Sequence, residues 1–153
     1  MNRVCMGFLL TTFLGLGGCQ LNIQAPNLDS ETQAQFYIQA IAQGQQAYYK
    51  ANGNFASSLD TLALNFDLET PDYRYNLVSE GKNNHRTIIT ATAKTDNLPS
   101  YAGLLVMNTT SESLDAVANF CQTTEPSKTA PVFPDTVSTD SIVDCPPGSI
   151  PVQ

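Results

Sequence analysis

The chain has few of the residues from which catalytic and metal sites are built. Its 153 residues include one histidine, His85, and they contain neither a Cys-x-x-Cys spacing nor a glycine-rich phosphate loop. A lone imidazole with no orienting partner visible in sequence does not indicate acid–base catalysis, and no serine has the context of a nucleophile elbow. The sequence therefore predicts a protein that is not an enzyme and that uses no cofactor.

Basic residues are also scarce. Seven Lys and Arg stand against fourteen Asp and Glu, which gives a net charge of −7. An acidic surface repels phosphate backbones and anionic lipid headgroups. We therefore expect no nucleic-acid partner and no membrane binding through a basic patch, and simple solubility accounts for most of the charge excess.

No apolar run is long enough for a retained membrane helix. The segment Phe8–Leu16 follows Arg3 and is too short to cross a bilayer core of ~30 Å, so it is typical of an N-terminal targeting signal. Its end, Leu16-Gly17-Gly18-Cys19, resembles the lipobox of bacterial lipoproteins. We predict a lipoprotein signal peptide over 1–18 and a lipid on Cys19 that anchors the chain to a membrane. The domain would then face the periplasm or the cell exterior. The alternative is an ordinary secretory leader with an incidental cysteine.

The four cysteines fit export from the cytoplasm. Cys5 falls in the leader and Cys19 would carry lipid, which leaves Cys121 and Cys145. In an oxidising compartment these two would form a disulfide and close a loop of about 25 residues, a stabilisation of roughly 3–4 kcal/mol on the chain-entropy model. Two separate buried thiols are the alternative interpretation.

One segment is long and periodic enough for a helix. After a tether over 19–29, apolar residues recur at helical spacing: Ala34, Ile38, Ile41 and Tyr48, with Tyr37 and Ala40 beside them. Ser30 and Gln33 fit a capping box at the start. Asn52-Gly53 terminates the helix at about Ala51.

Beyond the helix, apolar residues recur at every second position, as in β-strands. We expect a short helix over 59–64, capped by Ser57 or Ser58, and then four strands near 73–78, 86–94, 101–107 and 116–121, the third central because it is apolar on both faces. A helical turn capped by Ser113 is the alternative for the last. The prediction is an α+β domain over 30–153, with one long N-terminal helix on a roughly four-stranded antiparallel sheet. It ends in a loop over 121–145 and a flexible tail over 146–153.

Three short segments and the late cysteine pair carry a family resemblance. The segments are Gln45-Gln46-Ala47-Tyr48-Tyr49, the Asn52-Gly53-Asn54-Phe55-Ala56 element that follows it, and the strand residues Tyr73-Arg74-Tyr75. Over roughly residues 30 to 150 the chain resembles the type IV pilin-like G/H family of cyanobacteria. The resemblance implies a pilin-like fold in which a C-terminal disulfide loop is stapled to the sheet. It also implies partners among pilus or secretion-system proteins.

The N-terminus departs from that family. Cleavage after Gly7, as in a prepilin, would place Thr12 at the fifth position, where pilins carry the Glu that drives filament assembly. The apolar segment would also stop after about eleven residues, whereas a pilin continues for more than twenty. We therefore do not expect the chain to polymerise as a pilin does.

Two functions from different classes follow. The first is a membrane-tethered, non-enzymatic interaction module of the cell envelope, acting through the Cys121–Cys145 loop and the neighbouring sheet edge in type IV pili, secretion or adhesion. The alternative is a periplasmic lipoprotein that binds a small ligand or Ca²⁺. Asp135, Asp140 and Asp144 supply oxygen ligands for the ion, although their spacing matches no EF-hand.

Overall fold

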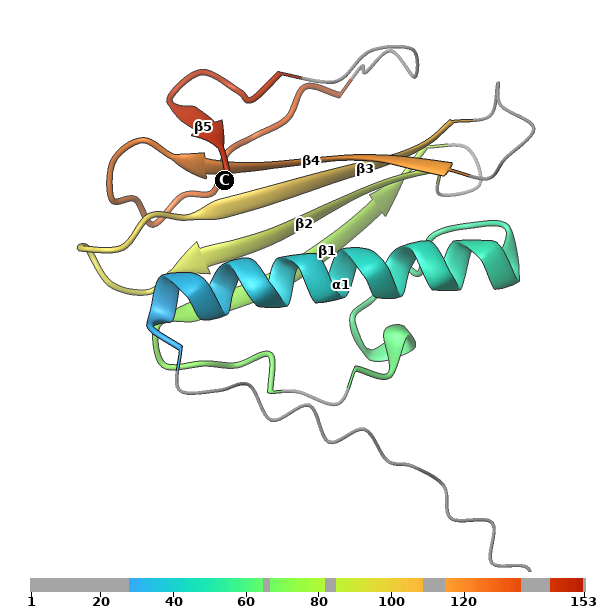
Figure 1. Ribbon diagram of the computed structural model, residues 1–153, viewed down its shortest axis with the longest axis horizontal. Helices are drawn as coiled ribbons and strands as arrows, with labels where there is room; N and C mark the ends of the chain where they lie inside the picture. The colour runs from blue at the N-terminus through green and yellow to red at the C-terminus, as the bar shows by residue number, and fades with distance from the viewer. Residues whose placement is uncertain (1–27, 65–66, 82–84, 109–114, 136–143, 153) are drawn as a thin grey trace, which may run out of the picture.

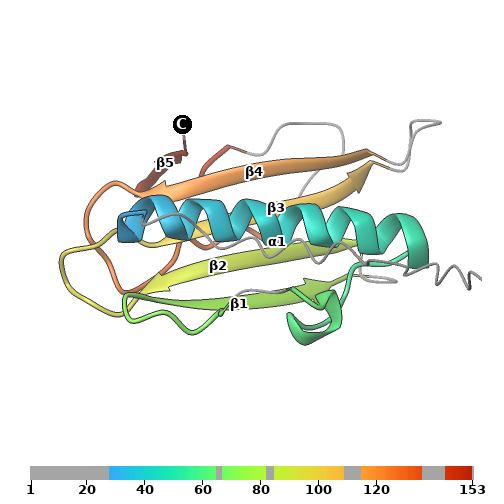
Figure 2. The same cartoon turned by 60° about the horizontal axis from the view of Figure 1, so that its bottom comes forward.

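A single long helix lies along one face of an antiparallel sheet. The computed structural model describes residues 28–64, 67–81, 85–108, 115–135 and 144–152. The described elements are the helix α1 (Ser30–Asn52), a 3₁₀ turn η1 (Asp60–Leu62), and the strands β1 (Tyr73–Glu80), β2 (Arg86–Ala93), β3 (Tyr101–Asn108), β4 (Asp115–Thr123) and β5 (Ser149–Pro151). The strands pair in sequence order, and α1 runs along them over β2 and β3 (Figures 1 and 2). The expected α+β class is confirmed.

The helix begins one residue earlier than the capping-box prediction required. Asp29, not Ser30, is the N-cap, and its carboxylate accepts hydrogen bonds from the Thr32 backbone N–H at 2.9 Å and the Thr32 hydroxyl at 2.8 Å. Ser30 donates its hydroxyl to Asp72 instead. At the other end Gly53 adopts a left-handed φ of 75° and donates its N–H to the Tyr49 carbonyl, so the predicted stop is confirmed.

The helical face that meets the sheet is the predicted one, except at its C-terminal end. Ala34, Ile38 and Ile41 are buried, whereas Tyr49 rather than Tyr48 points into the core. Tyr49 lies against Phe55, with ring centroids 4.9 Å apart. The prediction that Tyr48 lies on the buried helical face was wrong. An aromatic ring at position 48 or 49 continues the apolar face of the helix, and only the position of Phe55 decides which ring is buried.

The segment between helix and sheet is less helical than expected. The predicted helix over 59–64 is only η1, and no side chain caps it. Gln45, fully buried on α1, instead fixes the preceding segment: its amide accepts from the Ala56 N–H at 2.8 Å and donates to the Ala56 carbonyl at 3.0 Å. No local sequence pattern predicts this pair of buried hydrogen bonds.

The sheet contains one strand more than predicted. β1, β2 and β3 lie where expected, and β4 is a strand rather than a helical turn, although Ser113 itself lies outside the described residues. The prediction of four strands was wrong because Ser149–Pro151, expected to be part of a flexible tail, pairs with Cys121–Thr123 as β5. β3 is central, and both its faces are buried.

Two apolar clusters lie on opposite faces of the sheet. The larger one joins α1 to the helix side of β1, β2 and β3, and it contains the neighbouring, mutually tilted rings of Tyr37, Tyr73, Tyr75 and Tyr101. The smaller one joins Ala102, Leu104 and Val106 to Cys121 and Phe133. Within the described residues no helix is long and apolar enough to cross a membrane.

Candidate interaction surface

The segment after β4 folds back over the face of the sheet that the helix leaves open. Cys121 of β4 and Cys145 form a disulfide, with their Cα atoms 5.7 Å apart, so the expected pairing is present. Cys121 is fully buried and Cys145 is partly exposed. The cross-link therefore ties the end of the loop to the second-last strand of the sheet.

Phe133 anchors the first half of this loop. Its ring is 3% exposed and packs in the smaller cluster with Leu104 and Val106 of β3. Val132, the residue before it, is 77% exposed. The loop thus buries one large side chain beneath it and presents the adjacent one to solvent.

Arg86 holds the same stretch from the sheet side. The guanidinium group donates to the carbonyls of Pro134 at 2.6 Å and Asp135 at 3.1 Å, and it forms an ion pair with Glu80 at 2.6 Å. Only 10% of the Arg86 side chain is exposed. Sequence reasoning missed this residue because Arg86 is the first residue of a strand and reads as an exposed charge.

A third attachment lies at the end of the sheet where β3 begins. Ser100 is fully buried, accepts from the Ala93 N–H at 2.9 Å and donates its hydroxyl to the Ser127 carbonyl. The Ser127 N–H donates to the Leu98 carbonyl at 3.0 Å. The loop is therefore fixed at its start by backbone hydrogen bonds, in the middle by Phe133 and Arg86, and at its end by the disulfide.

The other predicted site residues are partly outside the described chain. Leu16, Gly17, Gly18 and Cys19 lie outside it, so the lipobox stays a prediction. Of the calcium candidates, Asp135 and Asp144 are exposed and Asp140 is outside the described part. The described residues include no group of three His, Cys, Asp or Glu side chains placed to hold a metal.

His85 has a hydrogen-bond partner that the sequence did not indicate. Its Nδ1 lies 2.5 Å from the Tyr49 hydroxyl, which joins the last turn of α1 to the start of β2. Burial raises the pKa of Tyr49 above its usual 10.0, so this hydroxyl stays protonated in the neutral range. The pair fixes the helix end to the sheet.

An open hollow lies at the β1 edge of the sheet. It is about 500 Å³ and lies between η1 and β1, where Leu59, Leu64 and Tyr75 form apolar walls and Asp60, Asp67 and Glu69 add carboxylates. Lys94 pairs with Glu69 at 2.8 Å and lowers the pKa of that carboxyl, so Asp60 and Asp67 carry most of the unpaired negative charge there.

Comparison with protein families identifies the chain. Residues 31–146, which run from the first turn of α1 past the disulfide, match the type IV pilin-like G and H family. The chain belongs to this family, and the helix, antiparallel sheet and C-terminal disulfide are consistent with a pilin-like fold. Comparisons with curated proteins and with solved structures gave no significant match.

Proposed function

We propose that this chain is a membrane-tethered, non-enzymatic structural module of a cyanobacterial cell envelope that contacts type IV pilus or secretion components. The observation that carries the proposal is the family match, because it spans both the long helix and the stapled loop. Proteins of this kind are generally structural, and the described surface offers an anchored loop rather than a set of converging catalytic groups.

The tether of this module is a diacylglyceryl group on the Cys19 thiol, and Cys19 becomes the first residue when residues 1–18 are removed. Stable anchoring requires two or more acyl chains, each buried methylene contributing ~0.8 kcal/mol. Without Arg3 the mature chain has six basic and fourteen acidic residues, so its charge is 6 − 14 = −8. Such a domain is repelled by anionic headgroups, and the lipid alone would hold it at the membrane.

The anchor is tested by intact mass and detergent-phase partitioning of the wild type beside Cys19→Ala. We expect the wild type to begin at an acylated Cys19 and to enter the detergent phase, and the variant to remain in the aqueous phase. A mature chain that begins at Phe8 and carries no lipid would contradict this proposal. It would indicate cleavage after Gly7, as in a prepilin.

The contact surface is the loop between Cys121 and Cys145 together with the adjoining β4–β5 edge. A photo-crosslinking residue at Val132, 77% exposed on the loop, tests it in cells against a control at Gln43, exposed on α1. We expect the Val132 position to capture a pilus or secretion-system protein that the Gln43 position does not. Equal capture at both positions contradicts the proposal. So does the absence of any captured partner, if a deletion strain also has unchanged pili, adhesion and motility.

A periplasmic lipoprotein that binds a small ligand or Ca²⁺ is the second candidate, and the hollow beside η1 is the observation that favours it. Its volume lies within the range of small-molecule sites, and its unpaired carboxylates favour a cationic small molecule, since the described residues include no group placed to hold a metal. A thermal-shift screen tests it: a cationic metabolite should raise the melting temperature by several degrees. The rise should disappear in Asp60→Asn/Asp67→Asn and persist in Asp135→Asn/Asp144→Asn.

A further inference from the structure

The turn that ends α1 contains a chemically reactive pair of residues. Asn52 is the last residue of the helix and Gly53 is its C-cap, and no other asparagine of the chain precedes a glycine. Because Gly53 has no side chain, its backbone nitrogen is open to approach by the Asn52 side-chain carbonyl carbon. Both residues are exposed, and in the described part of the chain no atom beyond the neighbouring residues lies within 4 Å of where a Gly53 Cβ would be. Water can therefore reach the pair.

The folded structure holds both reacting groups in hydrogen bonds. The Asn52 side-chain amide donates to the Tyr48 carbonyl at 2.9 Å, and the Gly53 N–H donates to the Tyr49 carbonyl at 2.8 Å. The Gly53 nitrogen can attack the Asn52 side chain only after it loses the proton in that second hydrogen bond. The folded turn therefore protects the pair, and a reaction between them requires the last turn of α1 to open.

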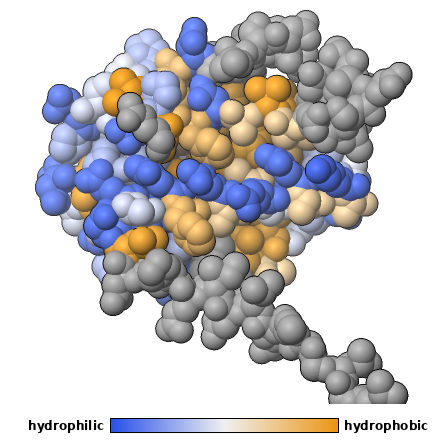
Figure 3. Space-filling view, viewed as in Figure 1, coloured by the Kyte–Doolittle hydropathy of each residue, from blue (hydrophilic) through white to orange (hydrophobic). Residues whose placement is uncertain are grey.

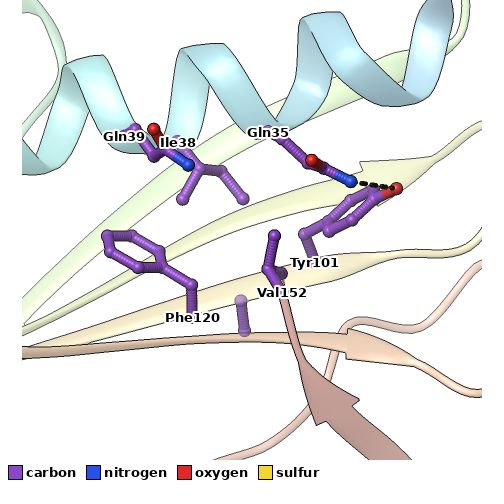
Figure 4. A pocket seen from close by; sticks show the side chains of 7 residues that line it. Gln35, Ile38, Gln39, Tyr101, Phe120 and Val152 are labelled. Atoms are coloured by element: carbon purple, nitrogen blue, oxygen red, sulfur yellow. Dashed lines mark hydrogen bonds between the residues drawn. The ribbon is translucent and has the colours of Figure 1, made fainter.

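The two ends of α1 are held unequally. In the first half of the helix, Ile38 points toward Phe120 and Val152, which rise from β4 and the end of β5 (Figure 4). On its outer side α1 forms a hydrophilic ridge (Figure 3), and residues 50–53 at its end are all exposed. Tyr49 is the one buried residue of the last turn. Local opening is therefore easiest at the C-terminal end, where little apolar surface has to be exposed.

One side chain attaches the last turn to the sheet. The Tyr49 ring packs against Phe55, and its hydroxyl lies 2.5 Å from Nδ1 of His85. The His85 carbonyl in turn accepts a hydrogen bond from the Met107 N–H of β3 at 3.2 Å. While these contacts persist, the Tyr49 carbonyl stays in place to hold the Gly53 N–H. The contact between Tyr49 and His85 thus opposes the opening that the reaction needs.

We propose that Asn52 is a site of spontaneous deamidation, and that the contact between Tyr49 and His85 controls its rate. The Gly53 nitrogen bonds to the Asn52 side-chain carbonyl carbon, the carbon–nitrogen bond of the side-chain amide breaks, and ammonia leaves with the proton from Gly53. Water then opens the cyclic imide at either of its carbonyls, which leaves aspartate or isoaspartate at position 52. The reaction consumes one water, releases one ammonia and transfers no electrons.

Deamidation loosens the end of the helix from the sheet. A carboxylate at position 52 cannot donate to the Tyr48 carbonyl, and it adds negative charge where the helix already has its partial negative charge. Isoaspartate also lengthens the main chain by one carbon, which displaces the Gly53 N–H from the Tyr49 carbonyl. Because ammonia is lost, the change accumulates as the protein ages. It requires neither the lipid anchor nor a partner, so it is independent of the proposed function.

Peptide mapping of the full-length protein by mass spectrometry tests the site. The protein is incubated in detergent at mildly alkaline pH, either folded or unfolded in guanidinium chloride, with Asn52→Gln as the unreactive control. In the unfolded chain we expect Asn52 to deamidate faster than any other asparagine. In the folded protein Asn52 should react about ten times more slowly than in the unfolded one, because two hydrogen bonds must first break. Equal rates in the two states, or no preference for Asn52 in the unfolded chain, overturn the proposal.

Two matched variants test the control by Tyr49. Tyr49→Phe keeps the ring in the core and removes the hydroxyl that meets His85, so it should speed deamidation of Asn52 in the folded protein several-fold. Tyr48→Phe should leave the rate unchanged, because Tyr48 lies outside the buried core. His85→Gln removes the same contact from the sheet side and should match Tyr49→Phe. If all three variants react at the wild-type rate, the contact does not control the reaction and the proposal is wrong.

Hydrogen exchange tests the effect of the product. Asn52→Asp supplies the aspartate product directly, whereas Asn52→Gln keeps an amide at the same position. Amide exchange at Gly53 should be faster in Asn52→Asp than in Asn52→Gln, because only the carboxylate repels the carbonyls at the helix end. Equal exchange in the two variants would show that deamidation to aspartate leaves the helix end intact, which contradicts the proposed loosening.

Discussion

The two faces of the sheet are covered by different means. On the helix side, regular elements meet through large apolar and aromatic side chains, and α1 alone contributes Ala34, Ile38 and Ile41. On the other side an irregular loop is held by a disulfide, by Phe133 and by Arg86. The first face depends on the hydrophobic effect spread over many contacts, and the second on a few specific attachments. The helix side should therefore determine global stability, and the loop side local order.

The largest expected effect is at Ile41, which is fully buried against the sheet. Ile41→Ala removes three carbons from a packed core and should lower the free energy of unfolding by about 4 kcal/mol. Urea denaturation followed by circular dichroism measures it, with Gln43→Ala on the exposed side of α1 as the control. A loss below ~1 kcal/mol would mean that the helix–sheet contact does not dominate stability.

Removal of the disulfide should have the next largest effect. Cys121→Ala/Cys145→Ala frees a loop of about 25 residues and should cost about 3 kcal/mol on the chain-entropy model. Hydrogen exchange should speed up in 124–135 and in β5, while α1 and β2 stay protected. Equally faster hydrogen exchange on both faces would show that the two faces unfold as one cooperative unit. It would contradict the assignment of global stability to the helix side and of local order to the loop side.

Arg86 provides a finer test of the loop side. Arg86→Lys keeps the charge but loses the fork that reaches two carbonyls, so it should cost about 2 kcal/mol and increase exchange at residues 131–135. The control is Arg74→Lys, on the exposed part of β1. If the Arg86 and Arg74 variants behave alike, the loop is held by Phe133 and the disulfide alone.

Alkaline pH should weaken the helix side selectively. Burial raises the pKa values of Tyr49, Tyr73, Tyr75 and Tyr101 above the usual 10.0. Above pH 10 the unfolded chain loses protons that the folded chain keeps, so the free energy of unfolding falls as pH rises, and it is unaffected by these groups below that pH. The slope reaches about 1.4 kcal/mol per pH unit for each tyrosine that ionises only when unfolded.

Urea unfolding at pH 8, 10 and 10.5 measures this slope. Tyr73→Phe should make it shallower, because one of the buried phenols is removed. An unchanged slope in Tyr73→Phe would locate the alkaline sensitivity elsewhere in the molecule.

The candidate interaction surface contains one contact that the sequence predicts and several that it does not. The pairing of Cys121 with Cys145 was predictable, because the expectation of export and the cysteine count leave few alternatives. The anchoring roles of Arg86 and Ser100 were not, because each bonds to a carbonyl at least 27 positions away in a segment without periodicity. The role of Phe133 was not either, because that segment itself gives no pattern from which its buried side chain could be chosen. A charged or hydroxyl side chain at a strand end is usually solvated, and only the returning loop buries it.

Local sequence patterns are enough to predict α1, its stop at Gly53, the four long strands and the central place of β3, because each follows from a periodic apolar pattern or a turn residue local to the element. Contacts between distant segments settle the features that local patterns leave open. They select Asp29 over Ser30 as the cap, since Asp72 takes the Ser30 hydroxyl, and Tyr49 over Tyr48 as the core ring, since Phe55 packs there. They also make a strand of Ser149–Pro151, whose three residues have no periodic signal and form a strand only because the edge of β4 provides hydrogen-bond partners.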